Sequence, residues 1–315
     1  MIAVVPHGDK KMTCLEAEVS SVLKWMKRSH EMMFLDSWGI DYQDNVKVRL
    51  GEKISLGKRE NRFTYLERFH GVKVTYVEGA SSDEIKKVIS KGTPVTVFGN
   101  MYWIPWEHPY YLKRDAPGHS FTVLGYIENE NSFVCMDCNF SNSYQIIGAD
   151  DFNRCVQNYL TYSIVDENAG ITNWRKAIAS HLQFLKDKNT LNRIDWFCED
   201  IKVSLDLKYE FEDYEVNSCP IFVRLTKVAN GRFLFSRALN FISENCNDSV
   251  PEKYSSKFSA LSDEWLILRG YLYKSYLQSI DNELVKIAAA EKVARIANSE
   301  KILLEQLLSE TIHLK

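Results

Sequence analysis

The sequence predicts an α+β domain followed by an all-helical domain. In about the first half of the chain, short apolar runs rich in β-branched residues alternate with segments of helical periodicity. After about residue 168 every periodic segment is helical, and 14 glycines and seven prolines in 315 residues are few enough for a chain with much helix. The pattern changes near "ENAG" (167–170), so we expect domains at 1–167 and 168–315, and the length also favours two moderate domains.

The first half contains both helices and strands. We expect the first helix at 14–27, "CLEAEVSSVLKWMK", because its apolar residues form one stripe with polar residues opposite. A second helix is expected at 81–92, with Ser82 as its N-cap and Gly92 as its end. The other elements expected here are strands at 72–79, 94–100, 119–127 and 132–140, a helix at 150–160 and a short strand at 161–166.

The second half is expected to be helical throughout. Helical periodicity covers 173–188, 238–246, 252–280 and 282–312. The last segment is rich in Ala, Glu, Leu and Lys, which are strong helix formers. These long helices could form a dimer interface or cover a site in the first domain.

Charge and hydropathy exclude several classes of protein. The formal net charge is −3 and no long basic run is present, so we expect no nucleic-acid partner. No stretch of about 18 apolar residues occurs, and the start "MIAVVPHGDKK" lacks a secretory apolar region. We therefore expect a soluble, cytoplasmic protein that does not associate with membranes.

The seven cysteines do not form a disulfide pattern. Their number is odd and they are scattered along the chain, so buried thiols are expected, one of which could be reactive. "CMDC" (135–138) matches a CxxC pattern, but neither a second ligand pair nor a helix start accompanies it. On a strand Cys135 and Cys138 should face opposite ways, so we expect no metal site.

Cys14, His119 and Asp137 are candidates for a nucleophilic site. Cys14 lies in the first turn of the first helix, where the helix dipole and free N–H groups favour a thiolate. His119 heads one strand and would be its base, while Asp137, near the end of the next strand, would fix the imidazole tautomer. The backbone N–H of Cys14 would supply half of an oxyanion hole. Without catalysis, Cys14 would be a small buried apolar residue and His119 a hydrogen-bonded structural histidine.

The strand pairing places a condition on this hypothesis. His119 and Asp137 share a face only if the two strands are joined by an odd-length loop or contain a bulge. We expect that irregularity near 128–131.

Four segments in order carry a resemblance to a known family: "TCLEAEVSSVL" (13–23), "EMMFLDSWGIDY" (31–42), "PVTVFGNMYWIPWEHPYY" (94–111) and "GHSFTVLGYIENENSFVCMDCN" (118–139). They resemble the butirosin-biosynthesis acyltransferase family (BtrH-type N-terminal domain), relatives of papain-like and bacteriocin-processing cysteine peptidases. The chain is also similar to the amide-forming enzyme of closthioamide-type polythioamide assembly. The resemblance implies a papain-like cysteine protease fold with a C-terminal helical domain. Where papain-type enzymes have an oxyanion-hole glutamine six residues before the cysteine, this chain has Gly8.

The resemblance also implies an activity, an acyltransferase that forms an amide bond. Cys14 would attack a thioester on the phosphopantetheine arm of an acyl or peptidyl carrier protein, so the enzyme needs no cofactor of its own. His119 would then accept a proton from a small amine that attacks the acyl-cysteine. Tyr102, Trp103 and Trp106 would line the acyl channel, or else belong to an ordinary core. Basic residues that could receive an acidic carrier, or simply be solvated, are Lys24, Lys27, Arg28, Lys58, Arg59 and Arg62.

Two alternatives remain open at this point. A cysteine hydrolase, either peptidase or thioesterase, would use the same three residues. A non-catalytic protein that binds an acyl ligand or a carrier would instead hold Cys14 beyond hydrogen-bonding reach of His119.

Overall fold

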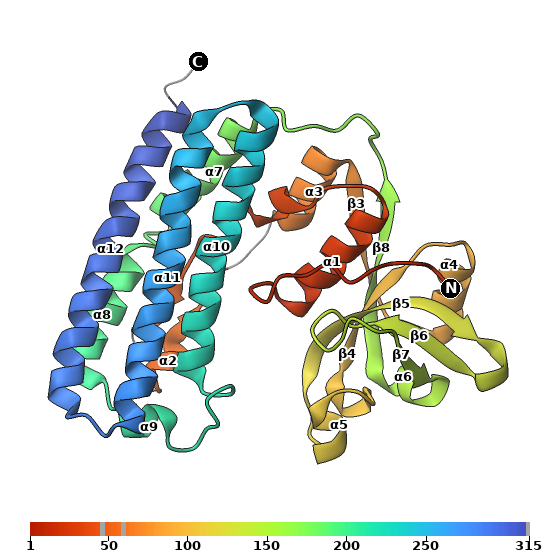
Figure 1. The fold of residues 1–315 in the computed structure, drawn as a ribbon, viewed down its shortest axis with the longest axis horizontal. Helices are drawn as coiled ribbons and strands as arrows, with labels where there is room; N and C mark the ends of the chain where they lie inside the picture. Colours follow the sequence, from red (N-terminus) through yellow and green to blue (C-terminus); the bar gives the residue numbers. More distant parts are fainter. Residues whose placement is uncertain (45–47, 58–60, 313–315) are drawn as a thin grey trace. The chain divides into compact units, whose positions relative to one another are not determined.

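A computed structural model of the protein describes residues 1–44, 48–57 and 61–312. The chain divides into two compact units, and both are discontinuous in sequence (Figure 1). The sheet unit contains Met1–His30 and Phe63–Gly170, and the helical unit contains Glu31–Arg62 and Ile171–Lys315.

This division differs from the predicted limits of 1–167 and 168–315, because residues 31–62 pack with the C-terminal helices. A side chain at Gly51 would overlap the backbone of Ile221, with its Cβ 2.1 Å from the Ile221 nitrogen. A side chain at Gly231 would lie 2.5 Å from the Ser37 carbonyl oxygen. Such close backbone approach requires glycine and fixes the inserted segment on the helices.

The sheet unit is built on a six-stranded antiparallel sheet, with strand order β3-β8-β4-β5-β6-β7 in the described residues. The strands are β3 (Val72–Glu78), β4 (Val95–Asn100), β5 (Pro117–Ile127), β6 (Ser132–Met136), β7 (Gln145–Gly148) and β8 (Val156–Ile164).

Helices lie on both faces of this sheet. The helices of this unit are α1 (Cys14–Trp25), α3 (Arg62–His70), α4 (Ser82–Ser90), α5 (His108–Leu112) and α6 (Ala149–Cys155), with short 3₁₀ turns at Met101–Trp103 and Glu128–Glu130. Phe121 and Val123 of β5 enter the main core cluster with side chains of α4 and α6, whereas Leu124 belongs to a separate small cluster. Helix α1 packs against β5, and this contact positions the site.

The helical unit contains the longest helices of the protein. Its elements are η1 (Glu31–Phe34), β1 (Asp41–Tyr42), α2 (Leu50–Lys53), β2 (Ile54–Ser55), α7 (Trp174–Asp187), α8 (Asn192–Ser204), α9 (Leu207–Phe211), α10 (Pro220–Cys246), α11 (Ser249–Leu277) and α12 (Asn282–Ile312). Helices α10, α11 and α12 run side by side in Figure 1. Within the described chain, no helix combines the length and apolar character that crossing a membrane requires.

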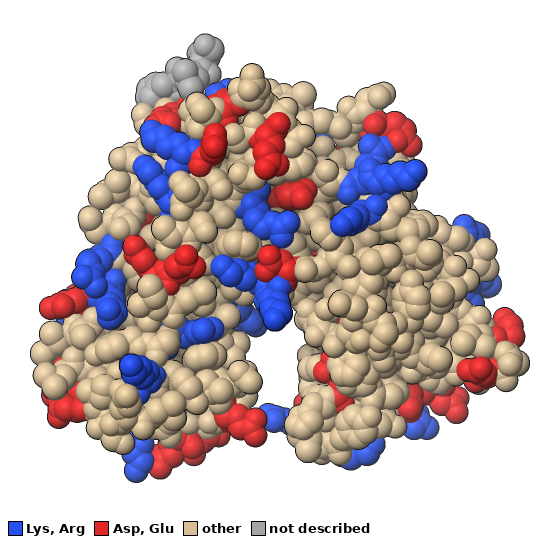
Figure 2. Space-filling model, viewed as in Figure 1, with Lys and Arg blue, Asp and Glu red and all other residues tan. Residues whose placement is uncertain are grey.

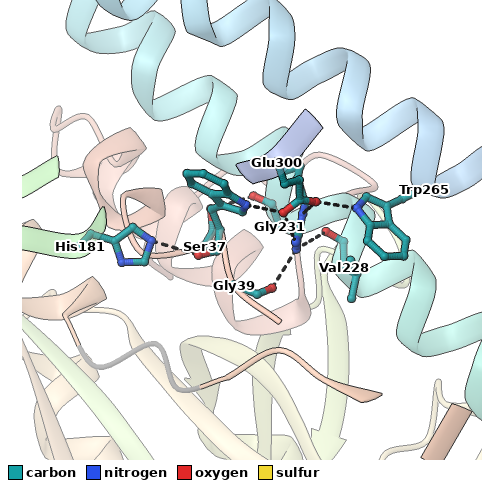
Figure 3. A network of polar contacts seen from close by, with 9 residues as sticks. Ser37, Gly39, His181, Val228, Gly231, Trp265 and Glu300 are labelled. Carbon is teal, nitrogen blue, oxygen red and sulfur yellow. Dashed lines mark hydrogen bonds and ion pairs between the residues drawn. The ribbon is translucent and has the colours of Figure 1, made fainter. Parts of the chain in front are cut away.

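A buried ion pair lies at the centre of the helical unit (Figure 3). Arg232 of α10 and Glu300 of α12 are both fully buried, and two nitrogens of the guanidinium donate to the two carboxylate oxygens at 2.9 and 2.8 Å. The indole nitrogens of Trp38 and Trp265 also donate to Glu300, at 2.7 and 2.8 Å. The Gly39 carbonyl accepts from Arg232 at 2.8 Å. This network ties the inserted segment to α10, α11 and α12.

Most predicted elements are present, and several boundaries required correction. The N-cap of α4 is Ser81, whose side chain accepts from the backbone N–H of Glu84, and not Ser82. The helix predicted at 150–160 ends at Cys155, and the chain continues directly as β8 from Val156. Strand β6 ends at Met136 rather than 140, and α8 was not predicted. The prediction for 282–312 is confirmed by α12.

Candidate active site

Cys14 is the first residue of α1, and the start of this helix is firmly fixed. Thr13 is the N-cap: its hydroxyl accepts from Glu16 N, and the Glu16 carboxylate accepts from Thr13 N at 2.9 Å. This capping box holds the first turn in place. The Cys14 thiol therefore lies at the positive end of a 12-residue helix, as predicted.

His119 and Asp137 form a buried acid–imidazole pair. The His119 Nε2 atom lies 2.6 Å from Asp137 Oδ2. Asp137 is fully buried and His119 is 7% exposed. His119 also forms a hydrogen bond with Cys14. Because Nε2 bonds to Asp137, Nδ1 is the ring nitrogen left for the interaction with Cys14. The structure thus joins the three predicted residues in one hydrogen-bonded line.

A bulge in β5 allows His119 and Asp137 to share a face. Near the turn Ile127 pairs with Ser132, so odd residues lie opposite even ones. The register shifts between Val123 and Gly125, after which Val123 pairs with Cys135 and odd residues lie opposite odd ones. The required irregularity is therefore present, but its predicted position near 128–131 was wrong, because the connection there has four residues.

Asp137 has two further hydrogen-bond donors. Trp106 Nε1 donates to Asp137 Oδ2 at 2.8 Å, and Asn139 N donates to Oδ1 at 3.2 Å. Burial raises the pKa of the carboxyl, but the bonds with His119, Trp106 and Asn139 outweigh it and lower the pKa. Asp137 is therefore ionised at neutral pH and orients the imidazole.

The electrostatics favour a thiolate–imidazolium pair. Burial alone would raise the pKa of Cys14, but hydrogen bonds with His119 and Ser120 and the charge of His119 lower it. Burial alone would lower the pKa of His119, but Asp137 and Cys14 raise it to about 10. The two shifts have one cause, since each charged group stabilises the other. A non-catalytic binding protein was expected to keep Cys14 out of reach of His119, and this hydrogen bond contradicts that expectation.

Ser120 touches the nucleophile and was not predicted. Its side chain is fully buried, and its hydroxyl has no nitrogen or oxygen partner within the described chain. The hydroxyl and the backbone N–H of Ser120 lower the pKa of Cys14. In the sequence, only the position of Ser120 next to His119 could have indicated this contact.

Glu107 places a second carboxylate beside the imidazole. Its Oε1 lies 3.6 Å from His119 Nε2, and burial raises the pKa of this carboxyl. Ligand atoms of Glu107, His119 and Asp137 lie within 4.8 Å of one another, a spacing that could hold a cation. Asp137 already shares the proton of Nε2 and accepts from Trp106, so we interpret the cluster as an acid–imidazole pair with a neighbouring carboxylate.

The predicted channel residues occupy different environments. Trp106 is 8% exposed and lines an open hollow of about 630 Å³ together with Glu107 and residues of α5 and β7. Tyr102 and Trp103 contact each other edge to face, with ring centroids 4.6 Å apart. Trp103 also packs against the main core cluster. Their role in binding an acyl group stays a prediction.

Among the predicted basic residues, Lys58 and Arg59 lie outside the described residues. In the sheet unit, Lys24 Nζ lies 3.1 Å from His7 Nδ1, and Arg28 forms an ion pair with Glu167. On the face shown in Figure 2, basic and acidic side chains are interspersed over the helical unit.

All seven cysteines are free, which confirms the expectation of thiols. Cys135 lies in the main core cluster, whereas Cys138 packs against the small cluster around Leu124. The sulfur of Cys138 lies 3.2 Å from Ser21 Oγ. The two cysteines of "CMDC" therefore occupy different environments, although only Cys135 lies in β6.

Gly8 packs directly against α1. A Cβ atom added at this position would lie 2.9 Å from the Cβ of Ala17. A glutamine here would force the segment away from the helix, so the oxyanion-hole residue of papain-type enzymes has no counterpart at this position.

The fold and the arrangement of the site resemble those of papain-like cysteine hydrolases and transferases. A helix carries the cysteine at its start, a following antiparallel sheet carries the histidine and acid, and a helical C-terminal region completes the predicted fold class. Residues 16–167 match the model of the Peptidase_C39 like family. The match includes His119 and Asp137 and begins two residues after Cys14. No curated protein matches the chain at a significant level.

Proposed function

We propose that this chain is a cysteine-dependent acyltransferase that forms an amide bond. It moves an acyl group from a carrier-protein thioester, through an acyl-cysteine at Cys14, to a small amine in a specialised-metabolite pathway of the cytoplasm. The hydrogen-bonded line of Cys14, His119 and Asp137 carries this proposal. The resemblance of four segments to the butirosin-biosynthesis acyltransferase family favours transfer to an amine.

The first half-reaction forms the acyl-enzyme. The Cys14 thiolate attacks the thioester carbonyl, a new C–S bond forms, and the C–S bond to the phosphopantetheine arm breaks. The departing thiolate takes a proton from the His119 imidazolium. In this proposal the N–H of Cys14, at the N-terminus of α1, stabilises the developing oxyanion.

The second half-reaction transfers the acyl group. The amine nitrogen attacks the acyl-cysteine, and neutral His119 accepts the proton that the nitrogen loses. The C–S bond to Cys14 then breaks and restores the thiolate–imidazolium pair. Asp137 holds the ring in one orientation through both steps, with Trp106 and Asn139 fixing the carboxylate.

A cysteine hydrolase is the second candidate. The match to a family named after peptidases favours it, and water would replace the amine in the second half-reaction. The two candidates share acylation of Cys14 and differ only in what removes the acyl group.

Intact-protein mass spectrometry tests the proposal. The protein is incubated with acylated carrier proteins encoded beside its gene, and we expect an acyl adduct that is absent from Cys14→Ser and His119→Ala. Adding candidate amines should remove the adduct and yield the amide. Release of free acid at the same rate with or without amine would identify a thioesterase. Wild-type protein that gives neither an adduct nor released acid or amide would contradict both the acyltransferase and the thioesterase.

A further inference from the structure

Glu18 is a buried carboxyl one helical turn below the nucleophile. It follows Cys14 by four residues on α1, so the two side chains lie on the same face of the helix. Glu18 is fully buried. Its Oε1 accepts from the backbone N–H of Cys138 at 2.7 Å, and its Oε2 lies 2.6 Å from Thr122 Oγ1. This one side chain therefore connects the helix of Cys14 to β5 and to the residue that follows Asp137.

Glu18 forms no ion pair with any cation in the described part of the chain. Titratable groups that interact with it are Asp137, Cys135, Cys138 and Tyr162, and none of these four supplies a positive charge. Burying an ionised carboxylate without a partner is costly, so the neutral acid is the stable form. Burial, together with the charge of Asp137, raises the pKa of Glu18 to about 8.

The hydrogen bonds around Glu18 suit a neutral acid. Cys138 N donates to Oε1, and Thr122 Oγ1 is placed to donate to Oε2. Because a hydroxyl can also accept, the neutral acid keeps both contacts when its proton lies on Oε2 and donates to Thr122. Thr122 Oγ1 is 3.0 Å from Thr96 Oγ1, which is 2.7 Å from the Tyr162 hydroxyl. A chain of hydroxyl groups thus extends from the carboxyl across β5, β4 and β8 and anchors it to the sheet.

We propose that Glu18 is a positioning residue which, as a neutral carboxylic acid, joins the helix that carries Cys14 to the backbone that carries Asp137. The inference rests on the proposed function, since it concerns how that site is held. Ionised Glu18 would add a second buried negative charge beside Asp137 and one turn from the thiolate. Activity therefore falls as the pH rises through the ionisation of Glu18, well before His119 loses its own proton.

Two substitutions of Glu18 test whether its role requires the hydrogen bonds of a neutral acid. In Glu18→Gln the amide oxygen accepts from Cys138 N and the amide nitrogen donates to Thr122, which reproduces the neutral acid without a titratable proton. Glu18→Leu keeps the approximate size and removes both hydrogen bonds. Glu210→Gln is the matched control, because Glu210 of α9 is also buried and accepts from Leu50 N and Gly51 N in the helical unit.

The test measures acylation of Cys14 by p-nitrophenyl acetate between pH 6 and 9, with thermal unfolding of each variant recorded. We expect wild type to lose activity with a midpoint near pH 8. Glu18→Gln should stay within about threefold of wild type at pH 7 and lack this decline, whereas Glu18→Leu should be about tenfold or more slower because the reacting groups lose their alignment. Glu210→Gln should keep the wild-type profile.

Several results would overturn the inference. These are a Glu18→Gln variant that keeps the alkaline decline, one as slow as Glu18→Leu, or a Glu18→Leu variant as fast as wild type. If wild type is not acylated at Cys14, the proposed function fails instead, and two other measurements decide the role of Glu18. The first is the infrared difference spectrum between wild type and Glu18→Gln, in which the carbonyl band of a protonated carboxyl that titrates near pH 8 supports the neutral acid. The second is iodoacetamide labelling of Cys14, which supports the positioning role if it is slower in Glu18→Leu than in wild type. Absence of either result contradicts the inference.

Discussion

The Asp137 carboxylate receives hydrogen bonds from three parts of the sheet unit. His119 comes from the start of β5, Trp106 from the connection between β4 and β5, and Asn139 from the turn after β6. Each donor favours the ionised form of Asp137, and together they offset its burial. The orientation of the imidazole therefore depends on residues outside the catalytic three.

Trp106 is the most informative of these donors to replace. Trp106→Phe keeps an aromatic ring against Phe121, whose ring lies 5.5 Å away, but removes a hydrogen bond to a charged group worth about 1.5–3 kcal/mol. We expect the pKa of Asp137 to rise and iodoacetamide labelling of Cys14 to slow by about tenfold. Trp103→Phe is the control, since Trp103 packs against the core and Arg154 without a bond to Asp137. Equal labelling rates in both variants would contradict this role of Trp106.

The raised pKa of His119 predicts a direction for the pH dependence of stability. A histidine whose pKa is higher in the folded than in the unfolded state stabilises the fold. This stabilisation is complete below the pKa of the unfolded state, which is about 6.5. That stabilisation is lost as the pH rises toward the folded value of about 10. Urea unfolding is measured for the Cys14→Ser variant and for the double variant that also carries His119→Gln. Both lack the Cys14 thiol, so its titration does not contribute. The stability difference between them should be largest near pH 6 and shrink above pH 6.5, and a difference that grows with pH would be inconsistent with the ion pair.

At this scale the sequence identified the residues whose chemistry is unusual for their position. Cys14 at a helix start and Asp137 within a strand could be recognised from the pattern alone. Glu18 and Ser120 could not, because helical periodicity assigns Glu18 to a polar face, and no pattern marks Ser120. Both are buried, Ser120 in β5 and Glu18 in α1, which buries its polar residues Glu16, Glu18, Ser20 and Ser21 as well as its apolar stripe. Burial of a helix on more than one side is a tertiary property.

Among the elements, α1 and the β5–β6 hairpin determine the site. The hairpin prediction rested on the alternation of side chains between the two faces of a strand. This alternation states whether an extra residue is needed for His119 and Asp137 to share a face, but not where that residue is inserted. The chain forms its bulge at Leu124, between Val123 and Gly125, and leaves a four-residue connection at 128–131. The same limit explains the helix predicted at 150–160, where α6 passes into β8 without a loop.

The capping box of α1 provides a test at the scale of the element. Thr13→Ala removes the N-cap side chain and should cost about 1 kcal/mol of unfolding free energy, as should Ser81→Ala in the equivalent box of α4. Only Thr13→Ala should slow labelling of Cys14, because only α1 carries the nucleophile. Denaturant unfolding and labelling rates of both variants check this prediction. Identical labelling in the two variants would mean that the helix start does not position Cys14.

In the whole molecule, the order of segments along the chain differs from their grouping in space, because the inserted segment 31–62 belongs to the unit of the C-terminal helices. The sequence showed the change to helical periodicity near residue 168, but nothing in it assigned an early segment to the C-terminal helices. That assignment depends on close contacts, such as Ser37 against Gly231, and on Trp38 donating to Glu300. Such contacts join residues more than 190 positions apart and leave no local pattern.

The buried ion pair predicts where the helical unit is most sensitive. Arg232→Met leaves Glu300 fully buried beside two indole donors without its cation, and we expect a loss of about 3–5 kcal/mol in unfolding free energy. Adding Glu300→Gln should recover part of this loss, because the buried charge is then removed. Urea unfolding of the single and double variants measures both effects. A loss below about 1 kcal/mol in the single variant would show that the pair does not organise this unit.

Selective alkylation tests the central claim, that Cys14 is activated by His119, most directly. The protein is treated with limiting iodoacetamide at pH 6, and the modification of all seven cysteines is quantified by peptide mapping in wild type and in His119→Ala. We expect Cys14 to react much faster than the other six thiols in wild type and to lose this preference in the variant. Equal labelling of Cys14 in the two proteins would contradict this claim.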